Sequence, residues 1–230
     1  LVDMEKNPGG VCLYRGCIPS KALLHVAKLI NETKEAKSWG IDFGEPQIDI
    51  DKLRAFKNKV VKKLTGGLGL LSNQRKINYV QGRASFASSS SIIVSKEDGS
   101  KEEISFDKAI IATGSVIASI PSLQIESRRL LNSTSALDLP AIPKSLLVVG
   151  GGYIGLELGS VYAALGSKVS VVEFMDRILP GADQDLVSHL QKRISKSFDK
   201  IMLQSKVVEI KEEGEELIVK IENKDKQIEE

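Results

Sequence analysis

The amino-acid sequence predicts an α/β protein with two domains and β-meander hairpins, and three observations lead to this prediction. Apolar residues recur at helical spacing between residues 22 and 68. Short β segments separated by turn residues fill residues 79–105. An apolar strand, a glycine-rich turn, a helix and a second strand then follow one another between residues 145 and 173. A chain of 230 residues is long enough for one large or two modest domains.

Composition and charge exclude several classes of protein. The chain is 42% hydrophobic and 27% charged, as is typical of a globular rather than a disordered protein. A net charge of +2 gives no reason to expect a nucleic acid or an acidic membrane as a partner. Residues 145–166 are apolar enough to raise the question of a membrane span, but they contain Glu157 and five glycines within their first fifteen residues. A βα unit explains that pattern better, and we expect no membrane association.

The first third of the chain is predicted to be mostly helical. Leu1 and Val2 end a strand, and a helix through residues 22–30 ends before Gly40. A second helix has one apolar face and an opposite face rich in lysine and arginine. The apolar face is formed by Leu53, Phe56, Val60, Leu64 and Leu68. We interpret the apolar face as buried and the basic face as solvated, and a nucleic-acid surface is the disfavoured alternative.

Strand and hairpin signals follow. Asp98-Gly99 predicts a turn between strands at 91–95 and 101–105. Residues 108–112 are predicted to form a buried strand. Residues 116–143, with prolines at 121, 140 and 143, are interpreted as a connection between domains. Residues 206–222 predict a hairpin that turns at Gly214.

A glycine-rich turn follows the apolar strand at residues 145–149. It reads Gly150, Gly151, Gly152, Tyr153, Ile154 and Gly155, which is the pattern G-x-G-x-x-G. A helix to Leu165 follows, and then a second strand at residues 168–172, which Glu173 terminates. The whole series falls within about thirty residues, which is typical of a Rossmann-like dinucleotide-binding unit.

Each part of this unit has a physical task. Gly150 permits the tight turn, Gly152 lets the backbone approach a pyrophosphate, and Gly155 lets the helix pack closely on the strand. The helix N-terminus offers N–H groups and partial positive charge to phosphates. Glu173 can accept hydrogen bonds from both ribose hydroxyls and would repel a 2′-phosphate, which favours NAD over NADP although Arg177 lies nearby. A glycine-rich packing turn without a ligand is the alternative.

The only cysteines, Cys12 and Cys17, predict a catalytic dithiol in a reducing compartment such as the cytoplasm. Cysteines five residues apart on an ideal helix point in different directions, so a bridge requires a distorted turn. As a structural crosslink, so short a loop would contribute only about 2 kcal/mol. A zinc site is disfavoured and we expect no metal, because His25 and His189 lack metal-site spacing. Arg15 adds positive charge, which favours a reactive thiolate.

The residues around the cysteines resemble the active-site segment of the dihydrolipoamide dehydrogenases, within the flavoprotein disulfide reductases. The resemblance rests on Gly9-Gly10-Val11-Cys12 and on Gly16-Cys17-Ile18-Pro19-Ser20-Lys21-Ala22-Leu23-Leu24. Residues 48–68, 112–115 and 144–157 are also similar, so the resemblance covers essentially the whole chain. It implies two Rossmann-like domains: an incomplete FAD-binding domain at 1–117 and an NAD-binding domain at 118–230 that is incomplete at its C-terminal end.

The resemblance also implies roles for individual residues. Cys12 would exchange with the substrate dithiol and Cys17 would lie against the flavin. Lys21, paired with Glu157, would lie near the reactive flavin nitrogen and stabilise negative charge on the reduced flavin. Tyr153 falls at a nicotinamide-pocket position. The further cofactor positions are Asp3, Ala84, Thr113, Gly114 and Ser115 for FAD, and Val207 for the NAD adenine. Ordinary surface charges (Lys21, Glu157) and a simple turn residue (Asp3) are the alternatives.

Three departures from the family pattern matter. Tyr14 and Arg15 stand where the family commonly has asparagine and valine, which makes the cysteine loop bulkier and more basic. The first FAD glycine motif should precede Leu1, and nothing matches the C-terminal interface domain with its His–Glu acid–base pair. We therefore expect a piece of a longer protein that does not complete the catalytic cycle alone and that loses FAD readily.

Together, these features predict oxidation of protein-bound dihydrolipoamide with FAD as cofactor and NAD as electron acceptor. The expected partner is a lipoyl-bearing protein of a 2-oxoacid dehydrogenase complex or of the glycine cleavage system, and the expected assembly is a homodimer. A related NADPH-dependent disulfide or metal-ion reductase is the first alternative, which Glu173 disfavours. A non-catalytic dinucleotide-binding fragment is the second.

Overall fold

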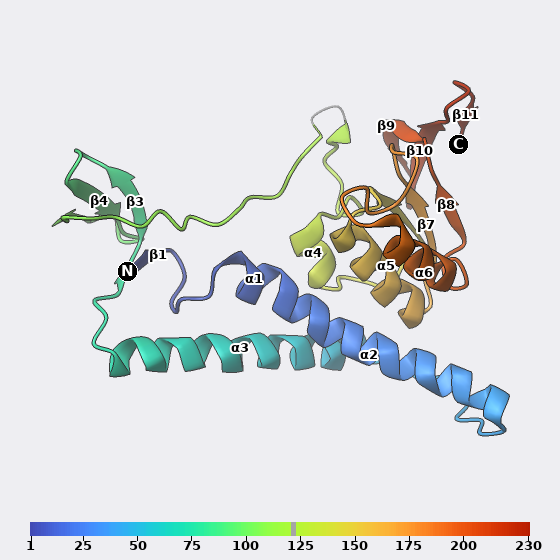
Figure 1. Cartoon of the computed structure of the whole chain (residues 1–230), viewed down its shortest axis with the longest axis horizontal. Coiled ribbons are helices and arrows are strands. Elements are labelled where there is room, and N and C mark those ends of the chain that lie inside the picture. The colour runs from blue at the N-terminus through green and yellow to red at the C-terminus, as the bar shows by residue number, and fades with distance from the viewer. Residues whose placement is uncertain (121–122) are drawn as a thin grey trace. The chain divides into compact units, whose positions relative to one another are not determined.

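The computed structural model describes residues 1–120 and 123–230, so Pro121 of the predicted connection lies outside the described residues. The chain divides into two compact units (Figure 1). Unit 1 comprises Leu1–Pro19 and Lys57–Val116, and unit 2 comprises Ser20–Phe56 and Ile117–Glu230. The predicted division into cofactor domains at residue 117 stays a prediction, because compactness alone does not identify a cofactor domain.

Unit 1 contains two small sheets and a short helix. A parallel pair is formed by β1 (Val2–Asp3) and β2 (Val80–Gln81). The antiparallel sheet has the order β3 (Arg83–Phe86), β4 (Ser91–Ser95) and β5 (Lys101–Ser105). The helix α1 (Gly10–Arg15) and most of α3 (Ile50–Gln74) belong to unit 1. Most of α2 (Cys17–Ala36) and the 3₁₀ turn at Lys37–Trp39 belong to unit 2.

The predicted hairpin at residues 91–105 is confirmed with the same strand bounds. Gly99 adopts a φ of 83°, which costs a residue without Cβ nothing. Asp98 accepts hydrogen bonds from the backbone N–H of Ser100 at 2.9 Å and from its hydroxyl at 2.6 Å. The turn chemistry was therefore sufficient to place this element.

The prediction for the faces of α3 is confirmed only in part, since Leu53 packs against the core as expected. Leu64 and Leu68 of the predicted buried face are exposed, whereas Lys57 of the predicted solvated face is buried. The side of the helix that is buried carries small residues, namely Thr65, Gly69 and Ser72. A Cβ on Gly69 would stand 2.1 Å from the Asn7 side chain, so the helix approaches the N-terminal turn through a residue that has no side chain.

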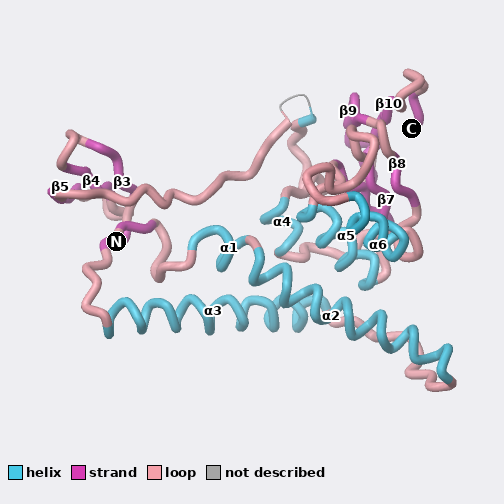
Figure 2. The backbone as a smooth tube through the Cα atoms, in the orientation of Figure 1, coloured by secondary structure: helices cyan, strands magenta, loops and turns pink. Residues whose placement is uncertain are grey.

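The predicted buried strand at residues 108–112 is also wrong. Residues 107–120 form neither helix nor strand (Figure 2), and Ile110 is 95% exposed. An extended apolar segment becomes a strand only when a neighbouring backbone supplies hydrogen-bond partners. None of the described strands pairs with this segment.

Unit 2 is built on a parallel sheet with the order β6-β7-β8. The chain alternates between strands and helices, and the elements are β6 (Ser145–Val149), α5 (Tyr153–Leu165), β7 (Lys168–Val172), α6 (Gln184–Ile194) and β8 (Lys200–Met202). Val149 pairs with Val172, and Val172 pairs with Met202. Parallel neighbours require crossover connections, and α5 and α6 are those connections. The predicted strand–turn–helix–strand unit is confirmed.

The core of unit 2 packs α5 against this sheet. Val161 and Tyr162 of α5 and Val169 and Val171 of β7 are all at most 1% exposed. Gly159 lies close to the sheet, because a Cβ there would meet the side chains of Val169 in β7 at 3.4 Å and Val148 in β6 at 3.5 Å. Burial of this kind contributes about 1.5–3 kcal/mol for each large apolar side chain, so the βαβ unit is rigidly supported.

The described part of the connection at residues 116–143 includes the helix α4 (Ser133–Leu137), which was not predicted from the sequence. The Asn132 side chain accepts hydrogen bonds from the backbone N–H groups of Thr134 and Ser135, both at 3.0 Å. The Ser135 hydroxyl in turn accepts the Asn132 N–H at 2.9 Å, which completes a capping box. This helix belongs to the core, because Tyr162 donates a hydrogen bond to the Ala136 carbonyl at 2.9 Å.

The C-terminal hairpin is confirmed. It consists of β9 (Lys206–Glu213) and β10 (Glu216–Glu222), turns at Gly214 with a φ of 60°, and is extended by β11 (Ile228–Glu229). Within residues 1–120 and 123–230, no helix combines the length and the apolar character that crossing a membrane requires.

Candidate active site

The glycine-rich turn joins the end of β6 to the start of α5. Gly150 has a φ of 106° and donates its N–H to the Val172 carbonyl at 2.8 Å, which ties the turn to β7. Gly155 has no room for a side chain, because a Cβ there would stand 2.5 Å from the Gly150 oxygen. Around Gly152, in contrast, the space that a Cβ would occupy is open. An open approach beside a helix N-terminus suits an anionic group such as a pyrophosphate.

Glu173 lies at the end of β7, where it was predicted, and it is buried. Its carboxylate accepts the Gly151 N–H at 2.6 Å and the Met175 N–H at 2.7 Å. The acid therefore holds the glycine turn as well as standing at the predicted ribose position. A carboxylate has about four acceptor positions, so about two remain for other donors.

Four further residues that the sequence associates with this site also lie in unit 2. Tyr153 and Ile154, the first residues of α5, are 68% and 44% exposed, so both side chains are accessible at the helix N-terminus. Arg177 donates a long hydrogen bond to Gln184 at 3.4 Å, and its buried Nε has no partner among the described residues. Val207, the predicted adenine contact, lies in β9 opposite Ile221 and is partly buried.

Lys21 and Glu157, which the resemblance pairs, are brought together within unit 2. The Lys21 Nζ donates to the Glu157 Oε1 at 2.5 Å. Lys21 lies one turn after Cys17 on α2, and residues four apart lie on the same helix face. Glu157, one turn into α5, therefore has a charged partner, which its place in so apolar a helix requires.

The two cysteines occupy different helices. Cys12 lies in α1 and Cys17 is the first residue of α2, and both are exposed thiols. Gly16 separates the helices with φ −142° and ψ −119°, so the distorted turn predicted from the spacing is present. A Cβ on Gly16 would stand 3.0 Å from the Cα of Cys12, which leaves room only for glycine at this position.

The predicted FAD-contacting residues lie in unit 1. Asp3 ends β1, and its carboxylate accepts the Glu5 N–H at 3.0 Å. Ala84 lies in β3 opposite Val94. The residues Thr113, Gly114 and Ser115 lie in the exposed segment without regular structure. A Cβ on Gly114 would stand 3.5 Å from the Val11 side chain, so this segment runs beside α1 and the cysteine turn.

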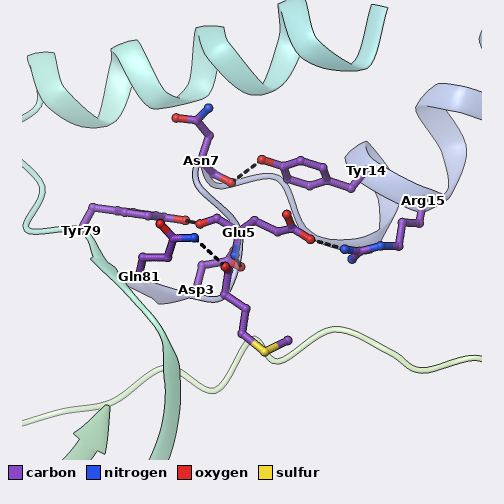
Figure 3. A network of polar contacts seen from close by, with 8 residues as sticks. Asp3, Glu5, Asn7, Tyr14, Arg15, Tyr79 and Gln81 are labelled. Carbon is purple, nitrogen blue, oxygen red and sulfur yellow. Dashed lines mark hydrogen bonds and ion pairs between the residues drawn. The ribbon is translucent and has the colours of Figure 1, made fainter. Parts of the chain in front are cut away.

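Sequence reasoning missed a network that holds the cysteine turn (Figure 3). Tyr79 and Gln81 donate to the carbonyls of Glu5 and Met4 at 2.6 and 3.0 Å. Burial, together with the negative charge of nearby Asp3, raises the pKa of Tyr79 to about 12. The signal available in the sequence was the unusual Arg15, which forms an ion pair with Glu5.

The fold and the site define a dinucleotide-binding α/β protein with a close pair of cysteines. The profile of the family described as "Pyridine nucleotide-disulphide oxidoreductase" matches residues 1–229, and the chain belongs to that family.

Relatives confirm the resemblance to dihydrolipoamide dehydrogenases. The chain is 47% identical over 224 residues to a dihydrolipoyl dehydrogenase of Haemophilus influenzae, a match that covers 97% of the chain and 47% of the relative. It is 49% identical over 216 residues to a dihydrolipoyl dehydrogenase of Vibrio parahaemolyticus, covering 93% and 45%. The chain thus spans about half the length of these curated relatives.

The fold class is confirmed by a solved structure. LpdA from Mycobacterium tuberculosis superimposes with a TM-score of 0.86 at 23% identity, over 99% of this chain and 50% of that one. At this identity the match concerns the fold alone, and it agrees with the α/β class expected from the sequence.

Proposed function

We propose that this chain is part of an FAD-dependent enzyme that oxidises protein-bound dihydrolipoamide and reduces NAD. The carrying observation is the combination of the Cys12–Cys17 turn with the family match over residues 1–229. In this proposal residues 1–117 contribute to an FAD-binding domain and residues 118–230 to an NAD-binding domain.

The chemistry at the cysteines is a disulfide exchange. One thiolate of dihydrolipoamide attacks the Cys12 sulfur of the oxidised pair, which breaks the Cys12–Cys17 bond and releases Cys17 as a thiolate. The second substrate thiolate attacks the substrate sulfur of the mixed disulfide, which closes the lipoamide ring and releases Cys12. The substrate loses two electrons, which the cysteines gain, and its two thiol protons pass to a base.

The residues described above would hold the two cofactors in this proposal. Asp3, Ala84 and Thr113–Ser115 would hold FAD, which when bound would carry the two electrons from the cysteines to NAD. Lys21, held by Glu157, would place a positive charge near the flavin. The remaining acceptor positions of Glu173 suit the ribose of NAD, and its charge disfavours a 2′-phosphate. The open space at Gly152 suits the pyrophosphate, while Tyr153 would border the nicotinamide and Val207 the adenine.

The proposed partner is a lipoyl-bearing protein of a 2-oxoacid dehydrogenase complex or of the glycine cleavage system. The name dihydrolipoyl dehydrogenase, carried by relatives that are 47% and 49% identical, supports this class of partner. We propose a cytoplasmic homodimer, in which residues outside this chain supply the acid–base pair.

The test is NAD reduction by dihydrolipoamide, measured on the full-length protein and on its Cys12→Ser variant. We expect turnover in the parent and none in the variant, while the variant still binds NAD. A flavin-loaded parent without turnover would overturn the proposal, and turnover only with NADPH would assign the protein to the sibling reductases.

A further inference from the structure

The cysteine turn is tied to the chain before it by two side chains that the proposed reaction does not use. The Tyr14 hydroxyl donates to the Asn7 carbonyl at 2.9 Å. The Arg15 guanidinium forms an ion pair with the Glu5 carboxylate (Figure 3). Both tethers end on residues 5–7, directly after β1.

The receiving end of these tethers is itself fixed. The Glu5 carbonyl accepts the Tyr79 hydroxyl, and the Glu5 N–H is held by the Asp3 carboxylate. Gln81 donates to the preceding carbonyl, that of Met4. Because Tyr79, just before β2, and Gln81 of β2 hold the carbonyls of residues 5 and 4, Glu5 offers Arg15 a stationary partner rather than a mobile one.

The tethers hold the residues between Cys12 and Cys17, whose conformation sets the distance between the two sulfurs. Arg15 is the last residue of α1, three residues after Cys12 and two before Cys17. The only residue between Arg15 and Cys17 is Gly16, whose non-helical backbone is a hinge between the two helices. Holding Arg15 therefore restrains the orientation of α1, and with it Cys12, relative to the start of α2.

We propose that Arg15 and Tyr14 are positioning residues that hold the cysteine turn on residues 5–7 and thereby set how readily Cys12 and Cys17 join in a disulfide. The proposal rests on the proposed role of these cysteines as a redox pair. Disulfide formation removes two electrons and two protons from the thiols, and in solution oxidised glutathione can accept both. Both tethers hold the same turn, so losing either one should shift the thiol–disulfide equilibrium in the same direction.

An electrostatic role for Arg15 makes a different prediction. Removing Glu5 would leave the guanidinium free to stabilise a thiolate, whereas removing Arg15 would leave a carboxylate that destabilises one. Glu5→Gln and Arg15→Gln would then shift the thiol–disulfide equilibrium in opposite directions. Positioning predicts the same direction for both, because each substitution breaks the same tether.

The experiment measures the thiol–disulfide equilibrium of the 230-residue chain in glutathione buffers, read by mass after trapping the thiols. We expect Glu5→Gln and Arg15→Gln each to shift the equilibrium by about two- to fivefold and in the same direction, because the ion pair is half-exposed. Tyr14→Phe should shift it in the same direction by less. The exchanged pair Glu5→Arg with Arg15→Glu should restore the parent value.

The matched control is Lys96→Gln, which breaks a similarly exposed ion pair with Glu102 next to β4 and should change nothing. Opposite shifts for Glu5→Gln and Arg15→Gln, or no shift in either, would overturn the positioning role. A parent chain that forms no internal disulfide would instead overturn the proposed redox pair. Circular dichroism on each variant identifies any that fails to fold, and the exchanged pair then decides the outcome.

Discussion

The glycine turn at residues 150–155 and the cysteine turn at residues 9–17 both lead into a helix, yet they are held differently. The glycine turn is fixed by buried contacts, namely the Gly150 N–H on β7 and the Gly151 N–H on Glu173. The cysteine turn is fixed by side chains at the surface, and the Arg15 side chain is 49% exposed. A buried turn is costly to alter, whereas a turn with surface tethers can be adjusted by one substitution without loss of the fold.

The largest effect on stability is expected from a substitution at the tightest point of the glycine turn. Gly155→Ala places a methyl group 2.5 Å from the Gly150 oxygen and 2.8 Å from Val148, neither of which can move freely. We expect a loss of about 1–3 kcal/mol in the free energy of unfolding, although alanine favours helix, measured by urea denaturation. Gly152→Ala, which meets open space, should unfold like the parent but bind NAD more weakly. Equal unfolding midpoints for Gly155→Ala and the parent would contradict the tight packing.

An effect of similar size on stability is expected when the carboxylate behind the turn is removed. Glu173→Ala leaves the N–H groups of Gly151 and Met175 without their acceptor, which costs about 1–3 kcal/mol if both stay buried. NAD affinity should fall while NADP affinity does not, since the repulsion of a 2′-phosphate also disappears. Calorimetric titration with both nucleotides measures this, and an unchanged preference would exclude Glu173 as the discriminating group.

Tyr162 tests the buried support of the same unit. Tyr162→Phe removes the hydrogen bond to the Ala136 carbonyl and should cost about 1 kcal/mol at neutral pH. Burial raises the pKa of Tyr162 to about 12 in the folded chain. Between pH 10 and 12 the unfolded chain loses this proton and the folded chain keeps it, so stability falls as the pH rises.

The variant should therefore lose stability less steeply than the parent over that pH range, measured by urea midpoints at several pH values. Tyr79, whose pKa is also raised to about 12, contributes a similar decline in both proteins and cancels in the comparison. Parallel pH profiles would show that Tyr162 titrates alike in the folded and unfolded chains.

The smallest effect on stability is expected in the cysteine turn. Arg15→Gln removes an ion pair in which about half of the arginine side chain is exposed to solvent. Such a pair contributes about 0–1 kcal/mol to the free energy of unfolding. The urea midpoint should hardly move while the thiol–disulfide equilibrium does. A loss as large as that of Gly155→Ala would show that the cysteine turn is part of the structural core after all.

The contrast also explains what the sequence could predict. Strands 91–95, 101–105, 145–149 and 168–172 were predicted with their observed bounds, because turn residues and apolar runs mark both ends of each. The glycine turn with Glu173 was predicted as well, since its contacts are local to one βαβ unit.

The errors concern contacts between distant parts of the chain. The faces of α3 were predicted only in part, because the approach of Gly69 to Asn7 joins residues 62 positions apart. The prediction of a strand at 108–112 was wrong because none of the described strands pairs with this segment, and periodicity does not reveal such pairing. The Glu5–Arg15 ion pair was missed because a single charge has no periodic signature.

The exposed segment after β5 has a consequence for handling the protein. Residues 109–120 include no charged side chain, and Ile110 and Val116 are 95% and 94% exposed. An extended, uncharged apolar segment with open backbone groups is a template for cross-β pairing between chains. These 230 residues should therefore self-associate as their concentration rises, and a lysine at position 110 should keep them monomeric for longer.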